Sequence, residues 1–260
     1  MKAVVEIVSL ALIFSLESFF PLFTERTGRI RHATRNLGLG ILNVVVVSLF
    51  FSSLLALDAA WTRDRNVGLV YLTGASSWTA TLLAFVLLDL WMYLFHRANH
   101  QVPFLWRFHR THHSDSQVDV TTALRFHTGE IAISSLFKLA LIPLLGVSLG
   151  QLLLYETCLQ PVILLHHSNV AIPEKWDRWM RLVIVSPNMH RVHHSQLRPE
   201  TDSNYSSIFS FWDRIARSFR RRPDPKSLEY GLPEFPGAEW QTFPGMLKTP
   251  LAPLRLPGRG

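Results

Sequence analysis

Three apolar stretches occupy the first hundred residues, and each is about long enough to cross the hydrocarbon core of a membrane. They run from Val4 to Phe23, from Asn36 to Leu57 and from Gly74 to Phe95. Charged residues make up only 17% of the chain, whereas ordinary soluble domains contain about a quarter. The sequence therefore predicts an all-α integral membrane protein in which these three stretches are spanning helices.

A fourth apolar region, from Ile131 to Leu165, is too short for two full spans and a turn. Pro143, Gly146 and Gly150 offer a break near its middle. We expect a short or re-entrant helical hairpin, which brings the total to four to five spans or re-entrant helices. A hairpin that leaves and returns on one side of the membrane lets the segments on its two sides meet there.

The distribution of arginine predicts the orientation of these helices. Four arginines lie between Glu25 and Arg35, and short loops rich in positive charge stay in the cytoplasm. Counting spans from this loop places the residues after Phe95 and the C-terminus in the cytoplasm as well. We expect an integral protein of a cell membrane, the bacterial inner membrane, with a helical cap on the cytoplasmic side that carries the histidine-rich segments after Phe95.

The C-terminal segment differs in composition from the rest of the chain. Residues 223–260 contain eight of the 15 prolines and show no sustained helical or strand periodicity. We expect an ordered cap or a loose tail here. The predicted division is a membrane-embedded domain at residues 1–222 and a proline-rich cap or tail at residues 223–260.

Histidines gather in three short boxes after the third apolar stretch. His96 and His100 are four residues apart, and the segments 109–113 and 190–194 each carry histidines at their first, fourth and fifth positions. On a helix, residues with these spacings share a face, so each box is expected to face one way. Eight of the 12 histidines lie in these boxes, a bias typical of metal-binding sequences.

The chemistry of clustered imidazoles points to a metal centre. Imidazoles repel one another when they are protonated, so a metal ion is expected to replace the protons. Eight imidazoles exceed the ligands that one ion takes up, and we therefore expect two ions; imidazole suits Fe, Zn, Cu and Ni. The single cysteine, Cys158, excludes cysteine-rich zinc sites and protein-held iron–sulfur clusters.

Four histidines lie outside the boxes. His166 and His167 end the fourth apolar region, and because adjacent side chains on a helix diverge, one of them is expected to be a ligand; we favour His167. His127, like His166, stays open as a ligand or as a neighbour of one. His32, alone at a membrane interface, is expected to be an ordinary hydrogen-bonded residue.

Asp89 precedes the first box on the same face of the third apolar stretch as Tyr93, His96 and His100. A carboxylate within a membrane is costly and usually has a partner. Asp89 is therefore a candidate acceptor for the free ring N–H of a metal ligand, or else it is paired with Asn43 or with a neighbouring helix.

The order of the boxes, HxxxH at 96–100 followed by HxxHH at 109–113 and at 190–194, is more specific than any one box. Together they resemble the fatty acid hydroxylase/sterol desaturase superfamily of integral-membrane non-haem di-iron oxidases. The resemblance implies two Fe ions, O2 as co-substrate, and hydroxylation or desaturation of an unactivated C–H bond of a lipid such as a fatty acyl chain or a sterol. The metal ligands predicted, with no catalytic side chain beyond them, are His96, His100, His109, His112, His113, His167, His190, His193 and His194.

Two other functions are consistent with a histidine-rich membrane protein. A metallohydrolase would use a zinc-bound water as nucleophile, with Asp115, Asp119 or Glu130 as general base, although HExxH and GxSxG motifs are absent from the sequence. A metal transporter or metal-storing membrane protein would place its ligands along a path within the membrane, whereas these histidines follow the spans. The lipid oxidase is the favoured interpretation.

An oxidase of this kind needs electrons from elsewhere. Reduction of O2 to water takes four electrons and the C–H bond supplies two, while the sequence has no GxGxxG pattern, no CxxCH haem attachment and one cysteine. We expect a lipid substrate, a membrane and an external electron donor, a ferredoxin or a cytochrome with its reductase. A basic docking surface for the donor is expected from Arg107, Arg110, Arg125, Arg178, Arg181, Arg191 and Arg214. The net charge of +7 suits anionic lipids, and no nucleic-acid-binding motif accompanies it.

Overall fold

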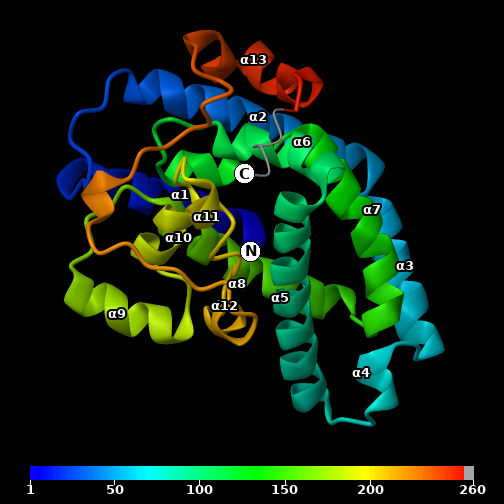
Figure 1. Cartoon of the computed structure of the whole chain (residues 1–260). Coiled ribbons are helices and arrows are strands. Elements are labelled where there is room, and N and C mark those ends of the chain that lie inside the picture. The colour runs from blue at the N-terminus through cyan, green and yellow to red at the C-terminus, as the bar shows by residue number, and fades with distance from the viewer. Residues whose placement is uncertain (255–260) are drawn as a thin grey trace.

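The computed structural model describes residues 1–254, and its regular elements within that range are helices (Figure 1). The α-helices are α1 (Lys2–Phe19), α2 (Arg29–Phe50), α3 (Ser52–Arg65), α4 (Leu69–Leu72), α5 (Ser77–Gln101), α6 (Pro103–His113), α7 (Thr128–Leu145), α8 (Leu149–His167), α9 (Glu174–Val183), α10 (Pro187–His193), α11 (Arg198–Thr201), α12 (Phe211–Ile215) and α13 (Phe243–Lys248). Short 3-10 helices are η1 (Val120–Leu124), η2 (Pro225–Ser227), η3 (Ala238–Gln241) and η4 (Thr249–Leu251). The all-α prediction is confirmed.

Among the described residues, three helices are long and apolar enough to cross a membrane: α2, α5 and α7. Large apolar side chains lie on their outer faces, such as Leu49 of α2, which is 72% exposed. The second and third apolar stretches of the sequence form α2 and α5, although the second breaks at Phe51 and continues as α3. α1 is not one of the three, since Lys2, Glu6 and Glu17 lie within it. The number of spans and their orientation stay predictions.

The predicted helical hairpin at residues 131–165 turns where the sequence offers a break, and its two helices pack against different neighbours. The chain reverses at Gly146, which ends α7 with a left-handed φ of 77°. A Cβ on the facing Gly68 would lie 2.1 Å from the backbone nitrogen of Gly146, so the turn needs glycine there. Beyond the turn, α7 packs against α2 and α3, whereas α8 packs against α1 and crosses behind α5 (Figure 1). Side chains of both α7 and α8 line a cavity instead of interdigitating.

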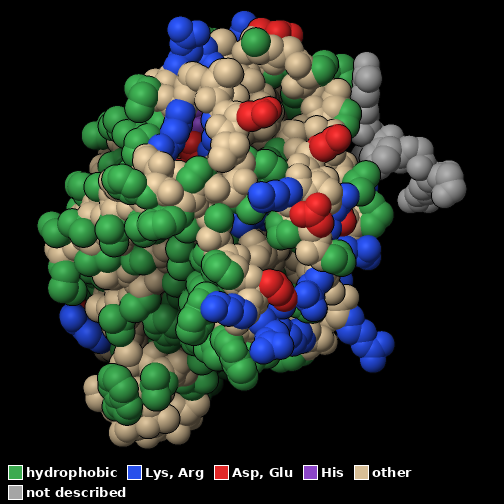
Figure 2. Space-filling view, turned by 90° about the vertical axis from the view of Figure 1, so that its left-hand side faces the viewer, with side chains coloured by type: hydrophobic (Ala, Val, Ile, Leu, Met, Phe, Trp, Pro, Cys, Tyr) green, Lys and Arg blue, Asp and Glu red, His purple; other side chains and the backbone are tan. Residues whose placement is uncertain are grey.

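α9 exposes its tryptophans and other large apolar side chains, whereas two of its charged side chains are buried. Trp176 and Trp179 are each 60% exposed, whereas Asp177 and Arg181 are buried and paired with each other. A helix on the surface of a soluble protein has the opposite arrangement, and tryptophan is enriched where proteins meet the membrane surface. Figure 2, which faces the side of the molecule that carries α9, shows hydrophobic side chains over much of its left-hand part. The surface therefore agrees with an integral membrane protein.

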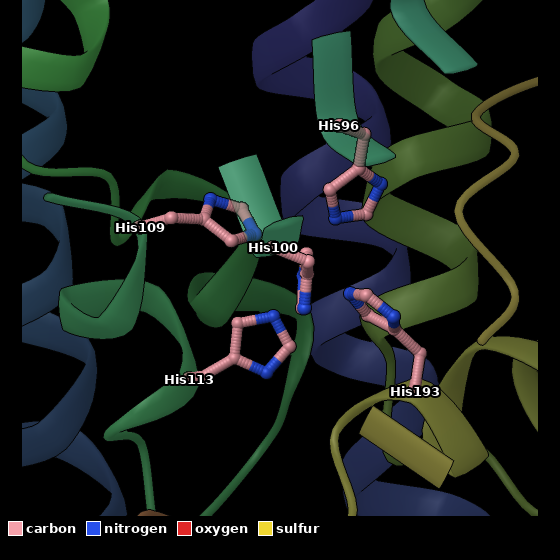
Figure 3. Close-up of side chains that lie close together, drawn as sticks. All are labelled: His96, His100, His109, His113 and His193. Carbon is pink, nitrogen blue, oxygen red and sulfur yellow. The ribbon is translucent and has the colours of Figure 1, made fainter. Parts of the chain in front are cut away.

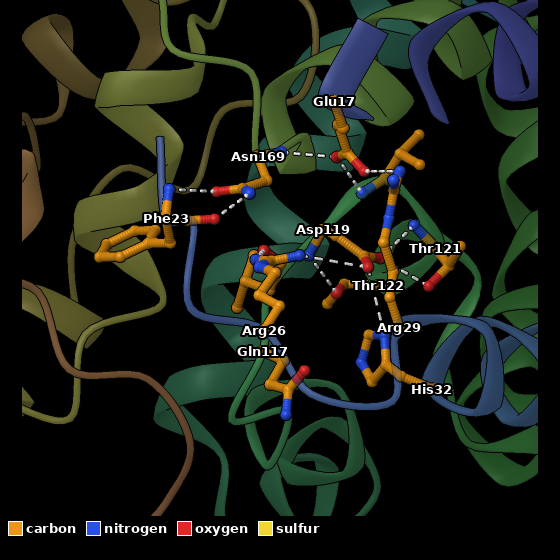
Figure 4. Close-up of polar contacts among 12 residues, drawn as sticks. Glu17, Phe23, Arg26, Arg29, His32, Gln117, Asp119, Thr121, Thr122 and Asn169 are labelled. Carbon is orange, nitrogen blue, oxygen red and sulfur yellow. Dashed lines mark hydrogen bonds and ion pairs between the residues drawn. The ribbon is translucent and has the colours of Figure 1, made fainter. Parts of the chain in front are cut away.

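A buried polar network ties α1 and α2 to the segment that follows the second histidine box (Figure 4). Glu17 of α1 accepts hydrogen bonds from the backbone N–H groups of Val120 at 2.8 Å and Asn169 at 2.5 Å. The ring of His32 in α2 lies 3.2 Å from a carboxylate oxygen of Asp119. His32 is thus the hydrogen-bonded residue that the sequence predicted, and the network holds the ends of two apolar helices against the histidine-rich part of the fold.

Residues 223–254 pack over α6 and beside the third histidine box. Arg110 of α6 donates to the backbone oxygens of Thr249 and Ala252, both at 2.5 Å. Ser195, next to the third histidine box, pairs with Tyr230 in an isolated β-bridge. The last part of the predicted cap or tail, residues 255–260, lies outside the described residues.

Candidate metal centre

Four helices bring the three histidine boxes and His167 to one place in the fold. His96 and His100 lie near the C-terminal end of α5, the second box ends α6, and the third box lies in α10 and its C-cap. Pro103 and Pro187 begin the two short helices, at the position where a proline removes no helix hydrogen bond. His167 is the last residue of α8.

Nine histidines form two groups, and each group could hold a metal ion. The first group, drawn in Figure 3, consists of His96, His100, His109, His113 and His193, and one ring nitrogen from each lies within 4.8 Å of the others. The second group, under the same limit, consists of His112, His167, His190 and His194. The structure thus brings together the nine residues that the sequence analysis named as ligands; that they hold metal stays a prediction.

Each HxxHH box contributes to both groups. In the second box, His109 and His113 belong to the first group and His112 to the second; in the third box, only His193 belongs to the first. Adjacent helix positions differ by about 100° of rotation, so neighbouring histidines of one box point into different groups. The expectation that each box faces one way is therefore wrong. The rings of His113 and His194, which belong to different groups, still stack with 4.7 Å between their centroids. The two groups are therefore neighbours, as a site for a pair of ions requires.

The nitrogens of the second group have the spacing of ligands on one ion. Nε2 of His167 lies 3.1 Å from Nε2 of His112 and 3.0 Å from Nε2 of His190. Because imidazole nitrogens lie about 2.0–2.1 Å from a metal such as zinc, two of them at about a right angle are about 3 Å apart. Nδ1 of His167 donates to the backbone oxygen of Ile163 at 2.8 Å, which leaves the lone pair on Nε2, facing the other two rings.

Two rings of the first group are held by the loop that follows α11. Nδ1 of His96 donates to the backbone oxygen of Tyr205 at 2.8 Å, and Nδ1 of His193 donates to that of Ser203 at 2.7 Å. Between them, Asn204 has a φ of 52°, in the left-handed region that asparagine tolerates. Its side-chain amide donates to the backbone of α10 at 2.8 Å. The loop therefore directs both carbonyl groups at the rings and leaves each Nε2 free.

Two carboxylates hold two further rings of the first group. Nδ1 of His109 lies 2.8 Å from Oε1 of Glu130, and Nδ1 of His100 lies 3.3 Å from Oδ1 of Asp202. A carboxylate in this position orients a metal-ligating imidazole and raises its basicity. From the sequence, Glu130 was expected only as a possible general base, and Asp202 was not identified as a partner of a histidine. Sequence spacing cannot reveal the Glu130 contact, because it depends on α6 packing against α7.

Within residues 1–254, the other ring nitrogens of the first group have no hydrogen-bond partner. These buried atoms are Nε2 of His96, His100, His109 and His193 and both ring nitrogens of His113. Buried polar atoms without partners are rare in folded proteins, and a metal ion would satisfy one nitrogen from every ring. Burial, together with the nearby histidines, lowers the pKa of His113 and of His193 well below its usual value, so both rings are neutral and can donate lone pairs. The residues therefore fit a bound metal, and an all-imidazole donor set suits iron, zinc, copper or nickel.

Glutamine in place of Glu130 is expected to weaken metal affinity or turnover by about 10- to 100-fold while the protein still folds. The amide oxygen can still accept from His109 and from Asn99, which now donates to Glu130 at 3.0 Å, but the negative charge is lost. Chelator competition on the purified Glu130→Gln variant measures the affinity. Unchanged affinity and turnover would contradict this role of the carboxylate.

The part of the chain that carries the two histidine groups also matches a known protein family. The profile of the fatty acid hydroxylase family matches residues 81–218, which is more than half of the sequence. The chain belongs to the fatty acid hydroxylase family. The match contains all nine histidines of the two groups, and it confirms the resemblance to the fatty acid hydroxylase/sterol desaturase superfamily.

Curated relatives of this fatty acid hydroxylase family member are larger proteins. An ornithine lipid hydroxylase of Rhizobium tropici is 34% identical over 155 residues, which are 58% of this chain and 45% of that protein. An alkylglycerol monooxygenase of Homo sapiens is 32% identical over 210 residues, 79% of this chain and 44% of that protein. A very-long-chain aldehyde decarbonylase of Oryza sativa subsp. japonica is 28% identical over 131 residues, 47% of this chain and 20% of that protein. The chain therefore spans less than half the length of these relatives. No solved structure is a significant match.

Two histidines that the sequence left open lie outside both groups of this family member. The ring of His166 stacks on that of His190, with 4.0 Å between centroids, at the edge of the second group. His127 caps α7, where Nδ1 accepts from a backbone N–H at 2.9 Å and Nε2 lies 3.2 Å from the backbone oxygen of Leu247. Of the two adjacent histidines that end α8, it is thus His167 that joins a group.

Asp89 contacts neither group. Its carboxylate accepts hydrogen bonds from Tyr155, from the indole of Trp212 and from the backbone N–H groups of Ile208 and Phe209, at 2.9–3.1 Å. The expectation that it accepts the ring N–H of a ligand is therefore wrong. A shared helix face extends over several turns, and Asp89 lies about 10 Å along the axis from the first histidine of α5. The alternative, that Asp89 pairs with a neighbouring helix, is confirmed, because the hydroxyl group of Tyr155 in α8 donates to Asp89.

Asparagine in place of Asp89 is accordingly expected to lower the stability of the fold and to leave the metal content of folded protein unchanged. The new NH2 group faces N–H and O–H donors, and each buried donor left without an acceptor costs about 1–3 kcal/mol. Thermal unfolding in detergent, with metal analysis of the folded fraction, measures both quantities for Asp89→Asn. A normally stable variant with at least tenfold weaker metal binding would contradict this assignment.

The predicted basic docking surface is mostly buried. Arg110, Arg125 and Arg191 are each 1% exposed or less, and Arg181 is buried in ion pairs with acidic residues of α9. Their guanidinium groups serve the interior instead, as when Arg125 donates to a backbone oxygen of α6 at 2.9 Å. Of the seven arginines, Arg178 is exposed. The expectation that these arginines form one docking surface is therefore wrong.

Proposed function

We propose that this chain is an O2-dependent membrane lipid oxidase that holds two Fe ions in its two histidine groups and hydroxylates or desaturates an unactivated C–H bond. The observation that carries the proposal is a cavity of about 600 Å³ that reaches both groups. It is lined by His96 and His109 of the first group, by His112, His167 and His190 of the second, and by His166, which belongs to neither group. A space for an apolar substrate thus opens on the nitrogens that would hold the metal.

The walls of the cavity suit a lipid chain. Away from the histidines they are largely aliphatic and aromatic, with Leu88, Trp91, Met92 and Leu159 among the lining residues. Ligand sites in proteins are typically apolar cavities of about 300–1,000 Å³ with a few polar groups. Relatives that are a lipid hydroxylase and an alkylglycerol monooxygenase support an oxidoreductase that acts on lipid.

The residues of the chain would hold and orient, and bound iron would supply the activation of dioxygen and the redox capacity. The nine histidines would be the metal ligands, while Glu130 and Asp202 keep two of the rings in place. Phe126 stacks on His112 with 4.4 Å between ring centroids and lines the cavity beside it. The apolar walls would hold one carbon of the substrate beside the histidines, and placement of that carbon decides which bond reacts.

The carboxylates that a zinc hydrolase would need as a general base are engaged in other contacts. Glu130 accepts from His109. Burial alone would raise the pKa of Asp115, but His32 and Arg125 lower it well below its usual value, whereas a general base works best with a pKa near the operating pH. These contacts favour the oxidase over the hydrolase.

The metal decides between the oxidase and its rivals. We would purify the full chain in detergent from cells grown on isotopically labelled iron, and measure metal content and Mössbauer spectra. The proposal expects two magnetically coupled Fe ions per chain. Zinc as the only metal would contradict it and support the hydrolase.

Product analysis tests the reaction itself. Cells that express the chain, or its His113→Ala variant as control, would be grown under isotopically labelled dioxygen and their lipids compared by mass spectrometry. A lipid that gains one labelled oxygen only with the unaltered chain indicates hydroxylation, and a lipid that loses two hydrogens indicates desaturation. Identical lipids in both strains and in purified assays with an electron donor would contradict the proposal.

A further inference from the structure

Four charged side chains line the same cavity away from the histidines. Lys2 and Glu6 belong to α1, Lys138 to α7 and Glu156 to α8. Nζ of Lys2 donates to Oε2 of Glu156 at 2.6 Å, and Nζ of Lys138 donates to Oε1 at 2.7 Å. Glu156 lies eleven residues before His167 on α8, which is about 16 Å of helix. We call these four residues the charged cluster.

The charged cluster sits where α7 and α8 separate. Each lysine reaches Glu156 from a different helix, so the cluster bridges the space between α1, α7 and α8. Its side chains are only partly covered: Lys2 is 36% exposed, Lys138 27% and Glu156 18%. The cluster therefore lies at an opening of the cavity, where a molecule from outside can reach it.

The hydrogen bonds between the helices use only part of what the charged side chains of the cluster can make. A carboxylate can be balanced by one ammonium group, but two share Glu156. Each ammonium has three N–H donors and makes one hydrogen bond within residues 1–254. Glu6, one turn after Lys2, lines the cavity and has no ion-pair partner in the same range. Charges are costly beside apolar walls, so unused donors and an unused carboxylate at an opening indicate a charged ligand.

We propose that the charged cluster binds the head group of a zwitterionic lipid. The anionic oxygens of the head group take the free N–H donors of Lys2 and Lys138, and its ammonium group contacts Glu6. The acyl or alkyl chain extends through the apolar part of the cavity to the histidines, so the length of α8 between Glu156 and His167 sets which carbon reaches them. The inference rests on the proposed lipid oxidase function and names the class of its substrate.

Binding of lipids that differ only in head group tests the proposal. The probes are lysophosphatidylethanolamine, which is zwitterionic, lysophosphatidylglycerol, which is anionic, and monoacylglycerol, which is neutral, all with the same acyl chain. Native mass spectrometry of the full chain in a neutral detergent measures their dissociation constants. We expect lysophosphatidylethanolamine to bind at least about tenfold more tightly than monoacylglycerol, because charge-assisted hydrogen bonds are lost with the neutral head group.

Charge-removing variants assign this preference to the cluster. A Lys2→Gln/Lys138→Gln variant is expected to bring the ratio of the two dissociation constants close to one, with monoacylglycerol binding unchanged. Glu6→Gln is expected to weaken lysophosphatidylethanolamine but not lysophosphatidylglycerol, which has no ammonium group. Lys138→Arg keeps the charge and is expected to keep the preference, and Lys226→Gln, at an exposed position outside the cavity, is the matched control.

The outcomes separate this inference from the proposed function. No preference in the unaltered chain, or equal loss of all three lipids in the double variant, would overturn the inference and leave the cluster as a clamp between helices. Because binding needs neither metal nor turnover, a clear preference in a protein that oxidises no lipid would contradict the proposed function alone. Oxidation of lipids without any head-group preference would contradict the inference alone.

Discussion

Alanine at His113 or at His194 is expected to remove metal from the centre and to lower turnover by more than about a hundredfold, since loss of a mere hydrogen-bond partner of a ligand costs 10- to 100-fold. These two residues make the cleanest test, because both ring nitrogens of each are buried and have no hydrogen-bond partner in the part of the chain that the structure describes. Alanine therefore removes a metal ligand without breaking a hydrogen bond of the protein. His113 belongs to the first group and His194 to the second, so each variant tests one of the two predicted ions.

Membrane insertion should be unchanged in both variants, since insertion depends on the apolar helices and not on the site. His127→Ala is the matched control with the opposite expectation. The ring of His127 makes two hydrogen bonds at the start of α7 and joins neither group, so its loss should lower stability by about 1 kcal/mol and leave metal content unchanged. Metal analysis and activity of the three purified variants are compared. Full metal content in His113→Ala together with normal turnover would contradict the ligand assignment.

The sequence predicted which histidines gather and did not predict how they divide. Spacing of three and four residues identifies a helix face and named eight of the nine residues of the two groups. The ninth, His167, was favoured from its place at the end of the fourth apolar region. The division depends on the 100° step between adjacent positions together with the place where α6 and α10 end. His112 and His113 are adjacent in the chain, yet their rings belong to different groups. The positions of both helix ends depend on tertiary packing, and tertiary packing cannot be predicted from the periodicity of a single helix.

Residues that orient the rings were missed for a related reason. Glu130, Asp202 and the carbonyl group of Ser203 reach histidines from other segments of the fold, at sequence separations of 10 to 102 residues. Asp89 was the opposite case, since it shares a face with His96 but bonds to Tyr155 and Trp212. Periodicity places a residue on a face of a helix. It does not show which residue of a neighbouring helix contacts it at that position along the axis. The same limit explains the hairpin, where Gly146 marks the turn but not the separation of α7 from α8.

Purified, iron-loaded protein is expected to show no sustained turnover with O2 and lipid alone. Hydroxylation converts R–H, O2, two electrons and two protons into R–OH and H2O, and desaturation to water likewise needs two electrons beyond those of the substrate. The sequence offers no GxGxxG segment for a dinucleotide, no CxxCH segment for haem and one cysteine, too few for an iron–sulfur cluster. We therefore expect a ferredoxin or a cytochrome with its reductase to supply the electrons, and adding such a pair should change the yield from at most a single turnover to many.

Because most of the predicted docking arginines are buried, we expect the donor to dock on another surface. The expected need for external electrons is unchanged. Arg110, Arg125 and Arg191 lie inside the fold. Exposed Arg31 and half-buried Arg35 instead line a polar hollow beside His32. Charge reversal at these two positions is therefore the informative substitution. Association between a basic surface and an acidic donor weakens as salt rises. In the reconstituted system, Arg31→Glu should raise the donor concentration needed for half-maximal rate, and Arg63→Glu, exposed at the end of α3, serves as the control. Many turnovers without any donor would contradict the electron requirement, whereas donor-dependent turnover that is indifferent to both substitutions and to salt would place docking elsewhere.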